Sequence, residues 1–186
     1  MSLRFQMPKL LRRFAADRKG VSAVEFALIL PLMMTLYIGG AEVSQALSAS
    51  RKVTLVSRTV ADLASQSSTV TDANMTNILN ASAAVVSPFP SNKLKVTVSQ
   101  VKIDNAGAAT VDWSDTLNGT KRGTGSSVTL PSALKVPNTW LIMTETNYEY
   151  APTMGYAIMG TLQLKDQMYM RPRLSEKVCR GQSCTS

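Results

Sequence analysis

The sequence predicts an α+β protein, in which a long N-terminal transmembrane helix continues outside the membrane and packs on a small antiparallel sheet. Three patterns support this. A stretch without charged residues runs from Phe26 to Ala41, apolar residues then recur along one helical stripe up to Leu63, and two later segments alternate apolar and polar residues. The first pattern is typical of a membrane span, the second of an amphipathic helix and the third of half-buried strands.

The membrane span is predicted for residues 21–42, after a basic leader at residues 1–20. Adding Val21 to Glu25 to the uncharged stretch gives about 21 residues, close to the ~20 that a helix needs to cross a bilayer. Five of the eight net positive charges of the chain lie in the leader. Because basic flanks stay on the cytoplasmic side, we expect a cytoplasmic N-terminus and a periplasmic or extracellular C-terminal domain.

Residues 43–68 are predicted to extend the same helix beyond the membrane. Their apolar positions are spaced alternately by three and four residues, which places them on one face of a helix. These positions are Ala46, Ala49, Val53, Val56, Val60 and Leu63. We expect this stripe to pack on the protein's own outer domain, and a coiled coil with a partner is the alternative.

Residues 69–186 are predicted to form a small α+β domain outside the membrane. A short helix is expected from Thr71 or Asp72, either of which can cap its N-terminus. The expected strands are 93–104, 110–117, 139–152 and 160–174. In the first strand the apolar alternation changes phase, which predicts a bulge near Ser99 and Gln100.

The composition argues against an enzyme, a metal site and a nucleic-acid partner. The chain has no histidine, which removes the commonest general base and the commonest metal ligand. Outside the leader, no basic stripe or nucleic-acid recognition motif appears. We therefore expect a non-enzymatic protein that needs no cofactor or metal.

Three stretches that could suggest chemistry have simpler interpretations. The segment GTKRGTGSS at 119–127 lacks the residue order of a phosphate-binding loop and is expected to be a flexible hairpin loop. The segment DWSDT at 112–116 is only faintly similar to a D-x-S-x-S metal loop, since Thr116 replaces the last serine. Glu145 and Glu149 share one face of a strand and are expected to be solvated.

Cys179 and Cys184 are the only two cysteines of the chain. Two thiols alone make a poor zinc site, because structural zinc takes four ligands. If the C-terminus lies in an oxidising compartment, we expect these cysteines to close a small disulfide loop, and free thiols are the alternative.

Glu25 is the residue that a plain membrane anchor does not explain. A charged side chain in the middle of a membrane helix costs about 2.5 to 3.5 kcal/mol on insertion scales, so it indicates a function. Snorkelling to the interface is one alternative. Another is a conventional cleaved signal ending near SQALSAS at 44–50, but a long apolar region that contains a glutamate argues against such a signal.

The stretch RKGVSAVEFALILP, residues 18–31, resembles the N-terminus of type IV prepilins, and most closely that of the TadE-like proteins of the tight-adherence (Flp) pilus. The resemblance implies a pilin-like fold and a leader that a membrane aspartic peptidase removes after Gly20. Val21 would then be the mature N-terminus, Glu25 the fifth mature residue and Phe26 the adjoining aromatic residue.

Cleavage would also give Glu25 a partner. A cut after Gly20 creates an α-amine on Val21, four residues from Glu25 and within about one helical turn of it. The positive end of the helix dipole lies at the same place. The carboxylate can pair with this amine or with the amine of a neighbouring subunit. The resemblance to pilins implies that assembly uses the amine of the neighbouring subunit.

The resulting hypothesis is a minor pilin or pseudopilin in the bacterial inner membrane, which acts in pilus assembly and surface adhesion. The partners that the resemblance implies are the prepilin peptidase, other pilins, and the inner-membrane assembly platform with its ATPase. The alternative is an uncleaved single-pass envelope protein whose outer domain binds another partner.

Overall fold

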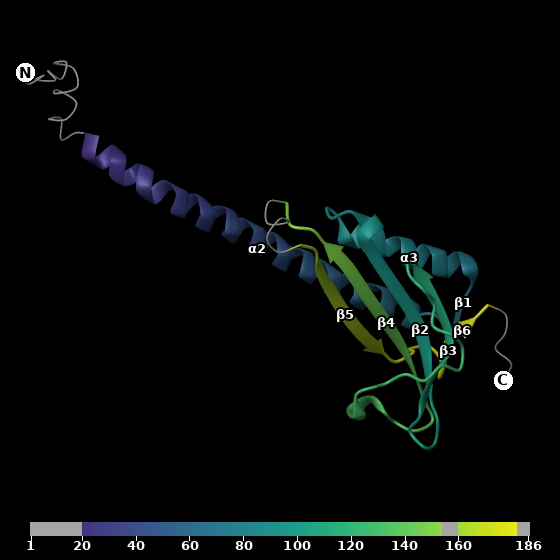
Figure 1. Cartoon of the computed structure of the whole chain (residues 1–186). Helices are drawn as coiled ribbons and strands as arrows, with labels where there is room; N and C mark the ends of the chain where they lie inside the picture. Colours follow the sequence, from purple (N-terminus) through teal and green to yellow (C-terminus); the bar gives the residue numbers. More distant parts are fainter. Residues whose placement is uncertain (1–19, 154–159, 182–186) are drawn as a thin grey trace, which may run out of the picture. The chain divides into compact units, whose positions relative to one another are not determined.

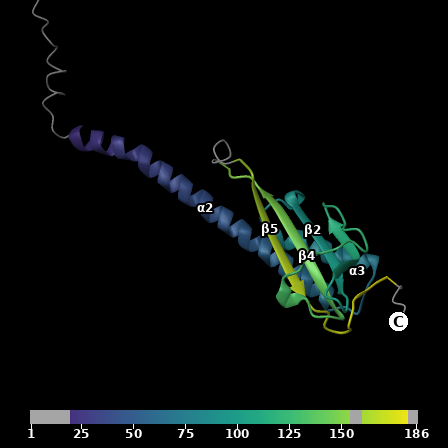
Figure 2. The same cartoon turned by 60° about the horizontal axis from the view of Figure 1, so that its bottom comes forward.

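A computed structural model describes residues 20–153 and 160–181. As predicted, it has an α+β fold: a long N-terminal helix precedes a small antiparallel sheet (Figure 1). The helices are α2 (Val21–Ser65) and α3 (Asp72–Val86). The sheet strands are β2 (Leu94–Ile103), β3 (Ala109–Leu117), β4 (Thr139–Tyr150) and β5 (Leu162–Met170), in the order β3-β2-β4-β5 (Figure 1). Figure 2 shows β5, β4 and β2 side by side.

The chain divides into two compact units between Val43 and Ser44, so that α2 contributes to both. In the first unit the apolar side chains of α2 are exposed, and within the described chain none of its most apolar stretch is buried. This stretch is long and apolar enough to cross a membrane. The described part of the chain leaves these apolar side chains uncovered, and lipid would cover them.

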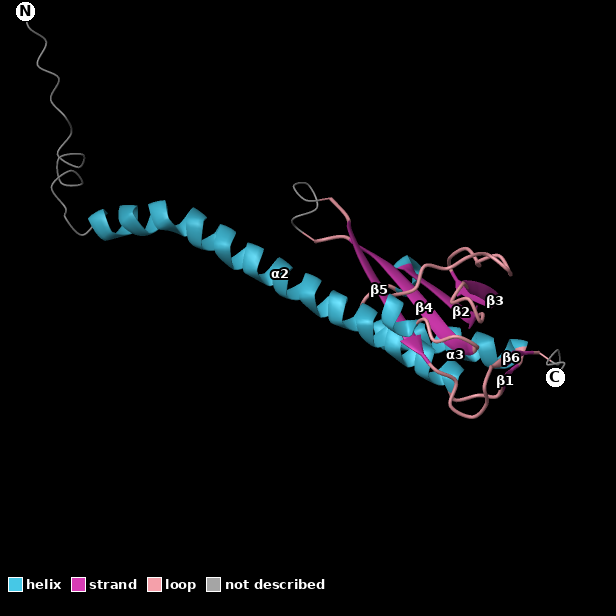
Figure 3. Cartoon of the chain, turned by 90° about the horizontal axis from the view of Figure 1, so that it is seen from below, coloured by secondary structure: helices cyan, strands magenta, loops and turns pink. Residues whose placement is uncertain are grey.

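In the second unit the end of α2 packs on the sheet together with α3 (Figure 3). The predicted stripe is the packed face: Ala49, Val53, Val56 and Val60 are buried, and Ala46 and Leu63 are partly buried against them. The stripe therefore packs on the protein's own domain, and α2 ends at Ser65.

Helix α3 begins where the sequence places it. The Thr71 hydroxyl accepts a hydrogen bond from the backbone N–H of Asn74 at 3.2 Å, which is the expected N-cap. Met75, Ile78 and Leu79 recur at helical spacing and are buried in the same core as the α2 stripe. The helix is thus amphipathic, and its apolar face covers the sheet.

Apolar residues lie on both faces of the sheet. On the face that α2 and α3 cover, called here the helix face, β2 contributes Leu94, Val96 and Val98. On the opposite face, called here the outer face, Val101 and Ile103 pack with residues of the loop before β4. That loop contributes Val128, Leu130 and Leu134, so one end of the outer face is covered and buried.

This arrangement corrects the predicted bulge. Strand β2 pairs with β4 in continuous register along its whole length, so β2 itself has no extra residue. The register shift lies in the pairing with β3, between Gln100 and Val101, and the unpaired residue is Asp112 of β3. The first half of β2 buries its helix-face residues, and the second half buries its outer-face residues. Because side chains alternate across a strand, this switch produces the phase change in the apolar pattern.

The segment after β5 returns to the sheet and is fixed there by hydrogen bonds. The short strands β1 (Thr69–Val70) and β6 (Cys179–Arg180) pair in parallel. The indole N–H of Trp113 donates to the Val178 carbonyl at 2.8 Å, and the Val178 N–H donates to Gln100 Oε1 at 2.6 Å. Gln100 is buried, so these two bonds satisfy polar groups that would otherwise be costly in the core.

Candidate functional site

The predicted processing site lies at the start of α2. Val21 is the first residue of the helix, and Gly20 precedes it. A Cβ atom added to Gly20 would meet nothing within 4 Å, and the Gly20 φ angle is not in the left-handed region. The described fold therefore gives no steric or backbone reason for a glycine at this position. Residues 1–19 of the predicted leader lie outside the described residues.

Glu25 and Phe26 lie on the first turns of the same helix. Glu25 follows Val21 by four residues, so both are on one side of α2, about one turn apart. Glu25 and Phe26 are both exposed, and Phe26 retains 60% of its accessible surface. Their side chains are thus available to lipid or to another protein rather than to this chain's own core.

The DWSDT segment forms part of β3, and its carboxylates have protein partners. Asp112 accepts a hydrogen bond from Gln100 Nε2 at 2.8 Å. Asp115 accepts from Lys121 Nζ at 2.7 Å and from Arg180 Nε at 2.6 Å. Within the described residues there is no group of three or more carboxylate, cysteine or histidine side chains placed to hold a metal ion.

The charges around Asp115 set its protonation state. Burial acts to raise the pKa of this carboxyl, but the hydrogen bonds and positive charges of Arg180 and Lys121 outweigh that effect and lower it. Arg180 also contacts Asp72 at 2.7 Å, and these carboxylates raise the pKa of its guanidinium. The role of this cluster is to join β3, β6 and the start of α3.

Glu145 differs from the solvated residue that the sequence predicts. Arg122 holds its carboxylate in a two-point contact, with Nε 2.6 Å from Oε2 and Nη2 2.7 Å from Oε1. The hydrogen bond from Arg122 lowers the pKa of Glu145, with burial acting in the opposite direction. Together with Lys121, this contact anchors the loop that was predicted to be flexible. A glutamate and an arginine 23 residues apart carry no local signal of such pairing.

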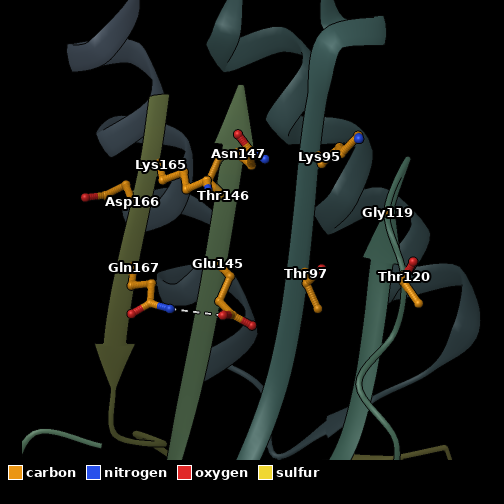
Figure 4. A pocket seen from close by; sticks show the side chains of 10 residues that line it. All are labelled: Lys95, Thr97, Gly119, Thr120, Glu145, Thr146, Asn147, Lys165, Asp166 and Gln167. Atoms are coloured by element: carbon orange, nitrogen blue, oxygen red, sulfur yellow. Dashed lines mark hydrogen bonds between the residues drawn. The ribbon is translucent and has the colours of Figure 1, made fainter. Parts of the chain in front are cut away.

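A groove of about 580 Å³ lies on the uncovered end of the outer face (Figure 4). The groove is lined by outward-facing polar residues of β2, β4 and β5, with Gly119 and Thr120 at its border. These outward-facing residues are Lys95, Thr97, Glu145, Asn147, Lys165 and Gln167. The sequence interpretation missed this site. In the sequence, the groove is indicated only by the polar residues that alternate with apolar ones in 139–150. This pattern does not reveal which neighbouring strands complete the groove.

Cys179 lies in β6, where its N–H donates to the Ser68 carbonyl at 2.9 Å. Cys184 lies outside the described residues. The pairing of these two cysteines therefore stays a prediction.

Comparison with known protein families gives a match to the N-terminal part of the chain. Residues 20–62 match the family described as TadE-like protein. The matched segment begins at Gly20 and contains Val21, Glu25 and Phe26, so the predicted resemblance is confirmed there. No curated protein and no solved structure matches the chain.

Proposed function

We propose that this chain, TadE-like over residues 20–62, is a minor pilin or pseudopilin of a tight-adherence pilus, processed after Gly20. The observation that carries the proposal is the glycine itself. Gly20 lies directly before a long apolar helix, at a position where the described fold does not require glycine. The described fold gives no reason for this glycine, and a prepilin peptidase that reads the residue would account for it.

In this proposal Glu25 becomes an assembly residue. Removing the leader places a charged amine on Val21, one turn from the Glu25 carboxylate. An ion pair within or between subunits then offsets the cost of placing a carboxylate in lipid. An exposed Glu25 suits pairing with a neighbouring subunit, because no residue of the outer domain has to move first.

The apolar helix anchors the protein as a single span in the bacterial inner membrane, and the α+β unit lies on the periplasmic side. The basic leader supports this orientation, because positive charges stay in the cytoplasm. The proposed partners follow from the same assignment: the prepilin peptidase, other pilins, and the inner-membrane assembly platform with its ATPase. The proposed role is in pilus assembly and surface adhesion, without catalytic activity.

Processing can be tested by substituting Gly20. The Gly20→Leu variant and a matched Gly39→Leu variant are co-expressed with a prepilin peptidase, and the chain length is read by immunoblotting. Gly39 is the matched control because it lies in α2, the helix that follows Gly20, and a Cβ added there would also meet nothing within 4 Å. We expect Gly20→Leu to stay at full length and Gly39→Leu to lose the leader. Normal shortening of Gly20→Leu would contradict the proposal.

The role of Glu25 can be separated from cleavage with a Glu25→Gln variant. This change removes the charge and keeps the side-chain shape, so the peptidase should still remove the leader. Without the carboxylate, pairing with the Val21 amine is lost, and co-purification with other pilins should fall. Undiminished co-purification would show that Glu25 has no part in assembly.

A further inference from the structure

We propose that the groove on the outer face binds an acidic saccharide, with Asn147 at its centre between Lys95 and Lys165. This site is separate from the processing segment, and the inference does not depend on cleavage after Gly20. It rests on the sheet register, on the charges that line the groove and on one polar atom that has no hydrogen-bond partner in the described part of the chain.

The register places three polar side chains in one row across the sheet. Asn147 of β4 pairs with Lys95 of β2 on one side and with Lys165 of β5 on the other. Figure 4 shows Asn147 between the two lysines. Side chains directly opposite each other on neighbouring strands lie about 4.5 to 5.5 Å apart at Cβ, so one small ligand can contact all three.

The charges in the groove favour an anion. Within the described residues, neither Lys95 nor Lys165 forms an ion pair. The carboxylate of Glu145 in the next row is already held by Arg122. Asp166 also borders the groove, but Figure 4 shows its carboxylate directed away from Asn147. Among the described residues the two ammonium groups therefore have no ion-pair partner, and the carboxylate of a ligand would supply one.

Glu149 is the remaining acidic group on this side of β4. It lies beyond Asn147 in a smaller hollow of about 100 Å³, which Lys93 and Lys95 also line. The three lysines Lys93, Lys95 and Lys165 outnumber Glu149 around these two hollows, so the net charge there is positive.

Asn147 favours a saccharide over a simple anion. Within the described residues its Oδ1 atom is buried and has no hydrogen-bond partner, although the Asn147 side chain lines the groove. A buried acceptor needs a donor, and an ionised phosphate chain offers only acceptors. A sugar acid has a carboxylate for the lysines and hydroxyl donors for Asn147. Thr97, Thr120 and Gln167 add further polar groups, and the groove volume is in the usual range for ligand sites.

The test is a calorimetric titration of the full chain in nanodiscs of zwitterionic lipid. The probe is trigalacturonate, compared with its methyl ester, which keeps the hydroxyls but lacks charge, and with tripolyphosphate, which has charge but no hydroxyls. We expect trigalacturonate to bind roughly tenfold more tightly than either comparator. No binding of trigalacturonate, equal binding of either comparator, or tighter binding of single-stranded DNA would overturn the proposal.

Variants locate the binding. Asn147→Asp keeps the side-chain shape and places a negative charge between the lysines, so it should weaken trigalacturonate binding by roughly tenfold or more. Lys95→Gln and Lys165→Gln should each weaken it, whereas Lys135→Gln, an exposed lysine outside the groove, should not. An equal effect of Lys135→Gln, or unchanged binding by Asn147→Asp, would contradict the assignment.

Discussion

Arg180 and Asp115 lie 65 residues apart in the sequence, and the Arg180 Nε donates a hydrogen bond to Asp115 Oδ2 across 2.6 Å. This contact joins β6, near the end of the described chain, to the edge strand β3. The same guanidinium contacts Asp72 at the start of α3. One arginine therefore connects the returning C-terminal segment to both a strand and a helix of the second unit.

Removing the charge of Asp115 should destabilise this unit. The Asp115 side chain is only 9% exposed, and an Asp115→Asn variant weakens two charge-assisted hydrogen bonds. We expect the free energy of unfolding to fall by about 2 kcal/mol. The measurement is urea unfolding of the detergent-solubilised chain, followed by tryptophan fluorescence, because Trp113 lies in the core. Asp72→Asn is the matched control, since Asp72 contacts the same arginine from an exposed position and should have little effect.

Acid should destabilise the same unit, with a sign that follows from the pKa of Asp115. Its folded pKa is below the ordinary value of about 3.9, so the unfolded state binds more protons as the pH falls through about 4. The stabilisation is complete above about pH 5 and is lost as the pH approaches the folded pKa. The wild-type free energy of unfolding should therefore decline toward acid pH more steeply than that of Asp115→Asn. Parallel curves would rule out this linkage.

The Arg122–Glu145 contact should hold the loop between β3 and β4. Arg122→Gln removes the two-point contact and leaves the strands in place. We expect faster amide hydrogen exchange in residues 119–127, with no change in β2. Lys135→Gln serves as the control, because Lys135 is an exposed residue of the same loop between β3 and β4. Unchanged exchange in 119–127 would mean that the backbone alone orders the loop.

Alanine substitutions should distinguish the packed face of α2 from its exposed face. Val60 is fully buried, whereas 47% of the accessible surface of Leu55 is exposed. Val60→Ala should lower the free energy of unfolding by about 2 kcal/mol, from lost burial and a residual cavity. Leu55→Ala removes more atoms but should cost less. The two variants can be compared by the same urea titration, and a larger loss for Leu55→Ala would contradict the packing.

The helical parts of the fold could be predicted because their signals are local. Val53, Val56 and Val60 repeat at helical spacing, and Thr71 precedes a run that it can cap, so each pattern lies within a few residues. The candidate processing site is local too, since Gly20 and Glu25 lie in one short motif.

The parts that could not be predicted depend on which strands become neighbours. The bulge was expected in β2, but the extra residue is Asp112 of β3, and a single strand's pattern does not reveal its partner's register. Glu145 looked solvated because Arg122 approaches it only in the folded chain. The row around Asn147 likewise exists only after three strands pair.

The most direct measurement of the central proposal is the mass of the N-terminal peptide of the chain extracted from bacterial inner membranes. If the protein is processed as a pilin, the chain begins at Val21 and the first 20 residues are absent. A chain that still begins at Met1, or one cut near Ser48, would contradict the proposal and favour an uncleaved anchor or a conventional signal.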